Sequence, residues 1–236
     1  MAKLVWDAAG QHLYETGIDH VVLYTMNAAG TAYNAGYVWN GVSSINESPS
    51  GADSNPIYAD NIKYLDLRAA EEFGCTIECY TYPDQFAECN GEAIPDQGIT
   101  IGQQSRKTFG LSYRTIIGND AKGNDYGYKL HLVYGCTASP SERSYSTVND
   151  SPEAGTFSFE VTTVPVSING YKSTALITID STKVIKSNHE ALEALLYGTD
   201  GVSGTDAQLP SPDTVLTTLG LTWDSTDKEW DAPSHT

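Results

Sequence analysis

Cysteine is the residue type in this sequence whose spacing comes nearest to a chemical motif. Cys75 and Cys79 stand close together and Cys89 follows, a grouping that suggests a zinc site. A fourth ligand and the usual spacing are missing. In a β-strand Cys75, Ile77 and Cys79 share one face, so we interpret these thiols and that of Cys136 as small buried apolar side chains. The sequence therefore predicts no metal site.

The histidines form no catalytic pattern, and the common hydrolase and nucleotide-binding motifs are absent from the sequence. The sequence has no H-x-x-x-H or H-E-x-x-H pair, no G-x-S-x-G elbow, no Walker A loop and no G-x-G-x-x-G turn. A catalytic cysteine would need an activating base that only the fold could bring near. We therefore expect no catalytic residue, no cofactor-binding residue and no enzyme activity. The histidines are dispersed along the chain: His12, His20, His131, His189 and His235.

Carboxylates are abundant, and two of them are enough for glycoside hydrolysis. Asp66, Glu71, Glu72 and Glu78 cluster in the sequence. In a chain with 30 Asp and Glu against 13 Lys and Arg, however, such clusters arise by chance and usually lie on solvated faces. The net charge of −17 also repels phosphates, which argues against sequence-reading or phosphate-gripping contact with nucleic acid. Repulsion suits a surface that lets DNA pass without sticking.

The amino-terminal residues and the apolar runs bear on where the chain is made and used. Residues 1–7 lack the apolar segment of a secretory signal. No apolar run approaches the ~18 residues that a membrane helix needs. We therefore expect synthesis in a reducing cytoplasm, where disulfides are rare, and no membrane insertion.

The elements that must position the acidic side chains are mostly strands. Tyrosine, threonine, valine and isoleucine are frequent and glycine-containing turns punctuate the chain, which predicts a mainly β fold. Lys107–Ile117 and Tyr126–Tyr134 are expected to form a hairpin. The full set of expected strands is Asp19–Met26, Tyr37–Ile45, Ile57–Leu67, Gly74–Tyr80, Lys107–Ile117, Tyr126–Tyr134, Gly155–Val164 and Tyr171–Ile179.

Two of these strands alternate clearly between apolar and polar residues. In Gly155–Val164 the side chains of Phe157, Phe159 and Val161 point to one side and Glu160 to the other. In Gly74–Tyr80 the side chain of Glu78 lies opposite Ile77. Both glutamates are therefore predicted to lie outside the core, on the polar faces of their strands.

The remaining segments read as loops, helices and an arm. Glu47–Pro56 contains two prolines, one glycine and three serines, which indicates a long exposed loop at the tip of a hairpin. A short helix is expected over Pro83–Cys89, and a longer amphipathic helix from a cap at Ser187 to a stop at Gly198. We predict a β domain over residues 1–198 and an acidic arm over 199–236 that packs on a neighbour or is partly disordered, with a possible short helix at Pro212–Leu219.

Several segments, in this order along the chain, resemble motifs of the major tail tube proteins of siphoviruses that infect Gram-positive bacteria. Each segment is weak by itself, but the ordered set is fairly specific, and it spans roughly residues 5 to 200. Residues beyond Gly198 match least well. The segments are ADNIKY at 59–64, ECYTYPDQF at 78–86, GQQSRKTFGL at 102–111, YGYKLHLVYG at 126–135 and FSFEVTTVP at 157–165.

This resemblance implies a structural subunit rather than an enzyme. Members of that family fold as a β-sandwich with a flanking helix, and their hexameric rings stack into a tube whose inner wall is a 24-stranded β-barrel. The genome passes through this tube during ejection, and the tape-measure and tail-end proteins are further partners. The resemblance thus implies that the chain belongs to the virion tail and assembles in the host cytoplasm. Glu78 and Glu160 are the candidates for facing the bore, with the outer wall of the tube as the alternative. Glu47, Asp53 and Asn55 are the candidates for a loop that reaches the next ring.

Two other classes of protein stay open on the sequence. A carbohydrate-binding or carbohydrate-cleaving β-sandwich would explain the tyrosines and the acids. A tail-completion ring or a secretion-tube ring protein would share the hexamer but stop at one ring or use another partner.

Overall fold

A computed structural model describes residues 4–96, 98–145, 147, 150, 154–201 and 204–232. Antiparallel strands dominate the fold, which confirms the mainly β prediction. The main sheet has eight strands in the order β2-β1-β11-β12-β13-β8-β3, and β14 also pairs with β12. Their bounds are β1 Leu13–Met26, β2 Tyr33–Val38, β3 Val42–Glu47, β8 Gly74–Cys79, β11 Phe109–Asn119, β12 Gly123–Ala138, β13 Phe157–Thr163 and β14 Leu176–Asp180.

Strand β12 belongs to two groups of strands. Its residues 129–133 pair with β14, whereas residues 136–138 pair with β13. Between the two stretches lies Gly135, which has a φ of 62°. A Cβ at this position would come within 2.1 Å of the Val164 carbonyl oxygen, so only glycine fits. The sheet therefore changes partners at this glycine.

One hydrophobic core has members from both groups of strands. Val21 and Leu111 reach it from β1 and β11, and Ile77 and Phe159 reach it from β8 and β13. Helix α1 (Phe86–Cys89) adds Phe86, whose ring centroid is 4.9 Å from that of Phe159. The four cysteines are free and buried, and they also belong to this core, as the sequence predicted: Cys75, Cys79, Cys89 and Cys136.

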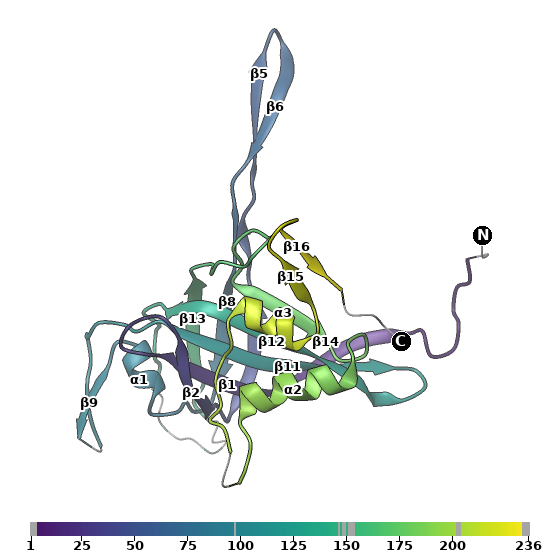
Figure 1. The fold of residues 1–236 in the computed structure, drawn as a ribbon. Coiled ribbons are helices and arrows are strands. Elements are labelled where there is room, and N and C mark those ends of the chain that lie inside the picture. The colour runs from purple at the N-terminus through teal and green to yellow at the C-terminus, as the bar shows by residue number, and fades with distance from the viewer. Residues whose placement is uncertain are drawn as a thin grey trace.

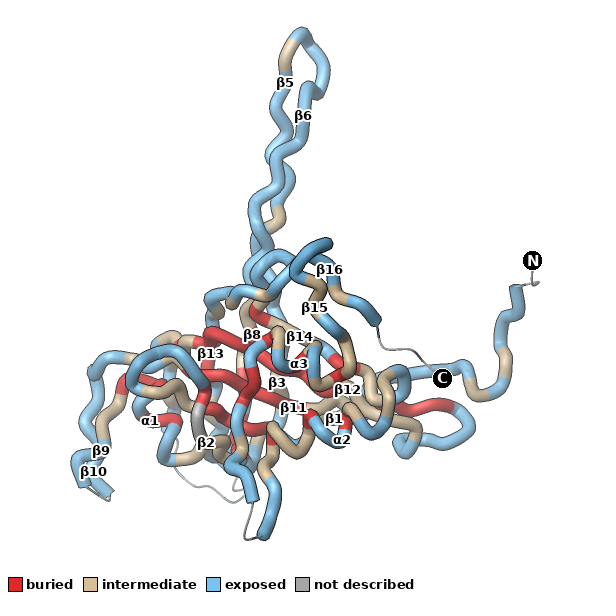
Figure 2. The backbone as a smooth tube through the Cα atoms, in the orientation of Figure 1, coloured by how far each residue is buried: buried red, intermediate tan, exposed pale blue. Residues whose placement is uncertain are grey.

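A second hydrophobic core lies under helices α2 (Lys186–Tyr197) and α3 (Pro212–Thr218). Tyr24 and Leu132 come from β1 and β12, and Leu192 comes from α2. The Tyr24 hydroxyl donates a hydrogen bond of 2.8 Å to the Leu196 carbonyl and so ties the strand to the helix. Figure 1 shows both helices lying against the strands β1, β11 and β12, and Figure 2 shows the buried residues concentrated along these strands.

Three hairpins, which contain four two-stranded pairs, extend from this body in the described residues. The longest is formed by β5 (Ser54–Ala59) and β6 (Ile62–Arg68), which project far from the sheet and are exposed along almost their whole length (Figures 1 and 2). Strands β4 (Ser50–Gly51) and β7 (Glu71–Glu72) pair at its root. The other two are β9 (Ala93–Asp96) with β10 (Ile99–Ile101), and β15 (Thr222–Asp224) with β16 (Glu229–Asp231).

Four of the predicted strand and loop assignments were wrong. The expected strand Ile57–Leu67 is parts of two antiparallel strands, β5 and β6, with a turn between them. The expected strand Tyr37–Ile45 is two strands, because Trp39 turns into the core and its indole N–H donates to the Thr81 carbonyl at 2.9 Å. The hairpin tip is not Glu47–Pro56, which contains β4 and the start of β5. It is the Asp60–Asn61 turn, where both residues have positive φ, as a tight hairpin turn requires. Tyr171–Ile179 was predicted too long, since β14 begins at Leu176.

The helices also differ from the prediction at their amino-terminal ends. The short helix expected over Pro83–Cys89 begins only at Phe86. Helix α2 ends at Gly198, as expected, but it begins at Lys186 after Ile185, which supplies no side-chain cap. Ser187 therefore lies inside the first turn, and its hydroxyl caps nothing. Helix α3 confirms the short helix expected at Pro212–Leu219, and Ser211 caps it by accepting a hydrogen bond from the Thr214 amide.

The predicted arm over 199–236 packs against its own chain. Leu209, Val215 and Leu219 are buried in the second core beside Tyr24 and Leu192. The packing therefore does not change at residue 198, where the domain boundary was placed. Residues 202–203 and 233–236 of the arm, including Pro233 and His235, lie outside the described residues.

Candidate functional site

The two glutamates selected from the sequence lie on one face of the main sheet. Strands β8 and β13 pair so that Glu78 is opposite Ser158 and Glu160 is opposite Thr76. Both glutamates are exposed, whereas Ile77 and Phe159 on the reverse face are buried. This confirms the alternation and brings the two carboxylates onto neighbouring strands, as diagonal neighbours ~7–8 Å apart at their Cα atoms.

Small polar side chains surround the two glutamates on the same face, and the exposed Tyr80 follows Glu78 at the end of β8. The Ser44 hydroxyl on β3 donates to Glu78 at 3.0 Å, and Asn46 lies beside it and donates to Ser44 at 3.4 Å. Across the other edge Thr137 on β12 stands opposite Thr162. We call this surface the polar face and define it by Ser44, Asn46, Thr76, Glu78, Thr137, Ser158, Glu160 and Thr162.

The polar face has the chemistry of an acidic, hydrogen-bonding surface. Its residues offer hydroxyls, one amide and two carboxylates, and no lysine or arginine is among them. The paired strands hold these side chains in place, because the reverse face is packed into the first core. Such a surface is negative and hydrated, and its defining residues include no cationic side chain that would bind a phosphate.

The projecting hairpin has the opposite character. Tyr58 on β5 and Tyr64 on β6 are exposed over about two thirds of their surface, at 68% and 66%. Its polar contacts are few: Lys63 binds Asp66 at 2.9 Å, and Ser54 donates to Asp66. These two hydrogen bonds lower the pKa of the Asp66 carboxyl, and the bond from Ser54 has the larger effect. Six large apolar side chains are exposed on it: Ile57, Tyr58, Ile62, Tyr64, Leu65 and Leu67.

A two-stranded hairpin with no layer behind it is marginally stable in water. Contiguous exposed apolar side chains usually mark a surface that meets another molecule. Sequence analysis missed these side chains, because the rising strand has a loop-like composition. The available signal was Asp60–Asn61 between two stretches rich in tyrosine and isoleucine, which is typical of a hairpin turn.

The three residues selected for a ring-to-ring loop are not equivalent. Asp53 and Asn55 are exposed on the rising side of the hairpin. Glu47 lies at its root, where its carboxylate accepts a 2.6 Å hydrogen bond from the Tyr113 hydroxyl and lies 3.5 Å from Nδ1 of His131. The rings of Tyr113 and His131 stack at 4.7 Å. Glu47 therefore ties the start of the hairpin to β11 and β12.

The groups considered for chemistry are separated or buried. Asp66 is on the projecting hairpin and Glu71 and Glu72 are at its root, whereas Glu78 is on the polar face. Burial raises the pKa of the thiols, to about 11 for Cys79 and about 12 for Cys89. Within the described ranges no three His, Cys, Asp or Glu side chains are grouped so that they could hold a metal ion.

Comparison with known protein families and with curated proteins found no match to this chain. In the part of the chain that is described, no helix is long and apolar enough to cross a membrane. The polar face and the projecting hairpin are therefore the features on which a functional assignment can be based.

Proposed function

We propose that this chain is the structural subunit of a tube, of the kind that major tail tube proteins build from stacked hexameric rings. The carrying observation is that one subunit has two contrasting surfaces. One is a rigid acidic face without cations among its residues, and the other is a projecting hairpin with six exposed apolar side chains. The first suits the wall of a bore, and the second suits contact with a neighbouring copy.

The proposed inner wall is built from four consecutive strands of each subunit. These are the carboxyl-terminal part of β12, then β13, β8 and β3. In this proposal they form one layer of a β-sandwich, β1, β11, β12 and β14 form the other, and α2 is the flanking helix. Strand β3 ends the strand order, so one of its edges is available for a strand of the next subunit.

Six subunits would then contribute 24 strands to one barrel. Strands spaced about 4.8 Å apart and tilted by up to about 45° give a circumference of about 115–160 Å. The barrel is then about 37–50 Å across, which leaves room for duplex DNA after the side chains are placed. Closing the barrel also removes the exposed sheet edges that favour aggregation.

The charge of the chain supports passage rather than binding of DNA. Six copies at −17 each carry about −100 per ring. Glu78 and Glu160 would present part of this charge to the bore. Salt screens charge repulsion beyond about 8–10 Å at ordinary ionic strength. A wall of carboxylates therefore repels phosphates only at close range, which would let the duplex slide without binding.

The hairpin supplies the proposed contact between rings. Burying one tyrosine or leucine side chain contributes about 1.5–3 kcal/mol. Each of the six hairpins in a ring carries six such side chains, so the same apolar contact can be repeated between every pair of stacked rings. The tape-measure protein and the tail-end proteins would be the further partners inside and at the ends of the tube.

Electron microscopy of the purified protein and of intact tails tests this proposal. We expect hollow filaments of stacked rings. A Tyr64→Ser variant should keep its fold but lose stacking, whereas Tyr171→Ser should stack normally, because Tyr171 is equally exposed but lies outside the hairpin. Single rings only would favour a tail-completion or secretion-tube protein. Monomers at high concentration, and tails whose tube lacks the chain, would contradict the proposal.

Hydrogen exchange gives an independent test of the hairpin contact. The amides of residues 54–68 should exchange fast in the free subunit, because nothing covers them, and slowly in the tube. Equal exchange in both states would remove the hairpin from the contact between rings.

A further inference from the structure

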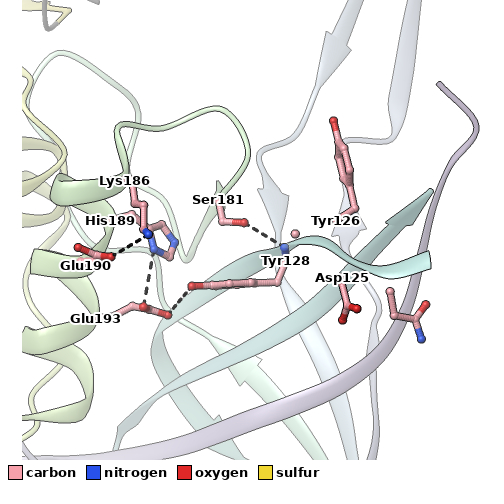
Figure 3. Close-up of a pocket in the computed structure, with 10 residues that line it drawn as sticks. Asp125, Tyr126, Tyr128, Ser181, Lys186, His189, Glu190 and Glu193 are labelled. Atoms are coloured by element: carbon pink, nitrogen blue, oxygen red, sulfur yellow. Dashed lines mark hydrogen bonds and ion pairs between the residues drawn. The ribbon is translucent and has the colours of Figure 1, made fainter. Parts of the chain in front are cut away.

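A cavity of about 390 Å³ lies between the start of β12 and helix α2, away from both the polar face and the hairpin. Tyr126 and Tyr128 line it from the strand, and Lys186, His189 and Glu193 line it from the helix. Figure 3 shows Tyr128 reaching from the strand toward His189 and Glu193 on the helix, whereas Tyr126 points away from them. A volume of this size is at the lower end of the range for small-ligand sites.

His189 is buried in this wall with a hydrogen-bonding atom unused. Its side chain is 4% exposed, and Nε2 has no hydrogen-bond partner among the described residues. The other nitrogen, Nδ1, faces Glu193 Oε2 at 3.9 Å. Burial lowers the pKa of His189, so the ring is neutral at pH 7. The carboxylate favours the proton on Nδ1, which leaves a lone pair on Nε2 that lacks a donor.

Glu193 also has one oxygen in use and one available. Oε1 accepts a 2.8 Å hydrogen bond from the Tyr128 hydroxyl and lies 3.8 Å from Arg114. Oε2 has only the 3.9 Å contact with His189. Thus two neighbouring acceptors, a carboxylate oxygen and an imidazole nitrogen, lack a donor in the same wall.

The other charged groups that line the cavity do not donate to these two acceptors. Lys186 is the lysine of the lining, but its ammonium lies 3.6 Å from Glu190 and is mostly in solvent. Asp125 adds a further carboxylate at the rim. Glu193 Oε2 and His189 Nε2 therefore lack a positively charged donor. Arg114 lies 4.5 Å from the centroid of the Tyr128 ring, so the ring of Tyr126 is the apolar surface that remains for an alkyl chain.

We propose that this cavity binds an aliphatic primary ammonium group. Its three N–H bonds can be divided among Glu193 Oε2, His189 Nε2 and a rim acceptor, whereas the planar guanidinium favours both oxygens of one carboxylate, of which Oε1 is already in use. In this proposal the imidazole rotates about its broad χ2 torsion when the ammonium binds, so that Nε2 reaches the cavity surface. The ammonium can come from a free polyamine or from a lysine side chain of a protein, and the experiment below separates these sources.

The test is a titration of the full-length protein with putrescine, followed by the ¹⁵N and ¹H shifts of the His189 ring. We expect saturable shifts with putrescine and none with 1,4-butanediol, which has the same length without charge. Glu193→Gln keeps the acceptor for Tyr128 and should weaken binding about tenfold. The matched control Glu229→Gln removes the same charge from exposed β16 and should change affinity less than about twofold.

A second variant acts in the opposite direction. Lys186→Met removes the internal ammonium beside Glu190 and should tighten putrescine binding by about threefold, and its exposed position keeps the fold intact. Nα-acetyl-lysine amide is titrated in parallel. Binding of both amines shows that a protein lysine suffices, and binding of putrescine alone identifies a free polyamine as the source. No shift with either amine, equal shifts with the diol, or equal losses in both Glu→Gln variants would overturn the proposal.

Discussion

The polar face and the projecting hairpin are both built from antiparallel strand pairs, yet they differ in what lies behind them. In β8 and β13 the residues alternate between a packed core and solvent: Ile77 and Phe159 are buried, and Glu78 and Glu160 are exposed. In β5 and β6 neither face is covered, and the adjacent Ile57 and Tyr58 are both exposed. The same backbone geometry therefore gives a self-supporting wall in one region and an uncovered apolar surface in the other.

This difference separates two sources of order. The first region is held by the core of its own subunit, so its strands are fixed before any assembly. The second has only its own strand pairing and a few polar contacts, so further order has to come from a partner. Substitutions in the two regions should therefore act on different measurements.

The largest expected effect is on stability in the first region. Phe159→Ala removes a ring packed against Phe86 and should lower the free energy of unfolding by about 3–5 kcal/mol. Tyr64→Ala in the hairpin should change it by less than about 0.5 kcal/mol, because the side chain is exposed in the free subunit. Urea denaturation of the monomer measures both, and comparable losses would show that the hairpin is supported by its own subunit.

A second and somewhat smaller effect concerns the carboxyl-terminal segment. Leu209 is buried beside Tyr33 and Tyr134, so Leu209→Ala should cost about 2–4 kcal/mol in the free subunit. Such a loss in the free subunit would show that residues 204–221 are held by the core of their own subunit, as β8 and β13 are. A stability loss that occurs only in assembled protein would instead return this segment to the role of an arm that packs on a neighbour.

The success of the sequence predictions follows the same division. Strands β8 and β13 were predictable because one face of each is buried, which imposes an apolar–polar alternation. The hairpin was misplaced because an uncovered strand needs no alternation, and the serines and prolines of residues 48–56 resemble a loop. Its exposed tyrosines could not be assigned to any face without the fold.

Other errors came from contacts between distant segments. The break in the predicted strand Tyr37–Ile45 depends on Trp39 reaching Thr81. The packing of the carboxyl-terminal segment depends on Leu209, Val215 and Leu219 meeting residues of β1 and α2. Nor could sequence spacing bring Glu47 to Tyr113 and His131 at the hairpin root. The exposure of the two glutamates of the polar face was predicted correctly, because it depended only on local alternation.

A third, smaller effect is expected from pH, at the junction between the two regions. Burial lowers the pKa of His131, against the opposing effect of Glu47. The unfolded chain then binds more protons than the folded one as the pH falls below about 6.5, so stability should decrease in that range. His131→Gln should reduce this slope between pH 7.5 and 5.5, as measured by urea denaturation. His189 acts in the same direction, so part of the slope should remain. An unchanged slope would exclude His131 as a contributor.

The smallest effect on stability is expected on the polar face itself, where the proposed function predicts a large effect on DNA. Glu78→Lys with Glu160→Lys leaves the buried side of both strands untouched, so the fold should lose less than about 0.5 kcal/mol and tubes should still form. If both side chains face the bore, the change adds about 24 positive charge units to each ring of six. Phosphates would then be attracted, and DNA ejection from mutant tails should slow and become dependent on salt. Ejection at the normal rate from correctly assembled mutant tails would show that these two residues do not line the path of the DNA. The tube assignment would then be retained with a different inner surface.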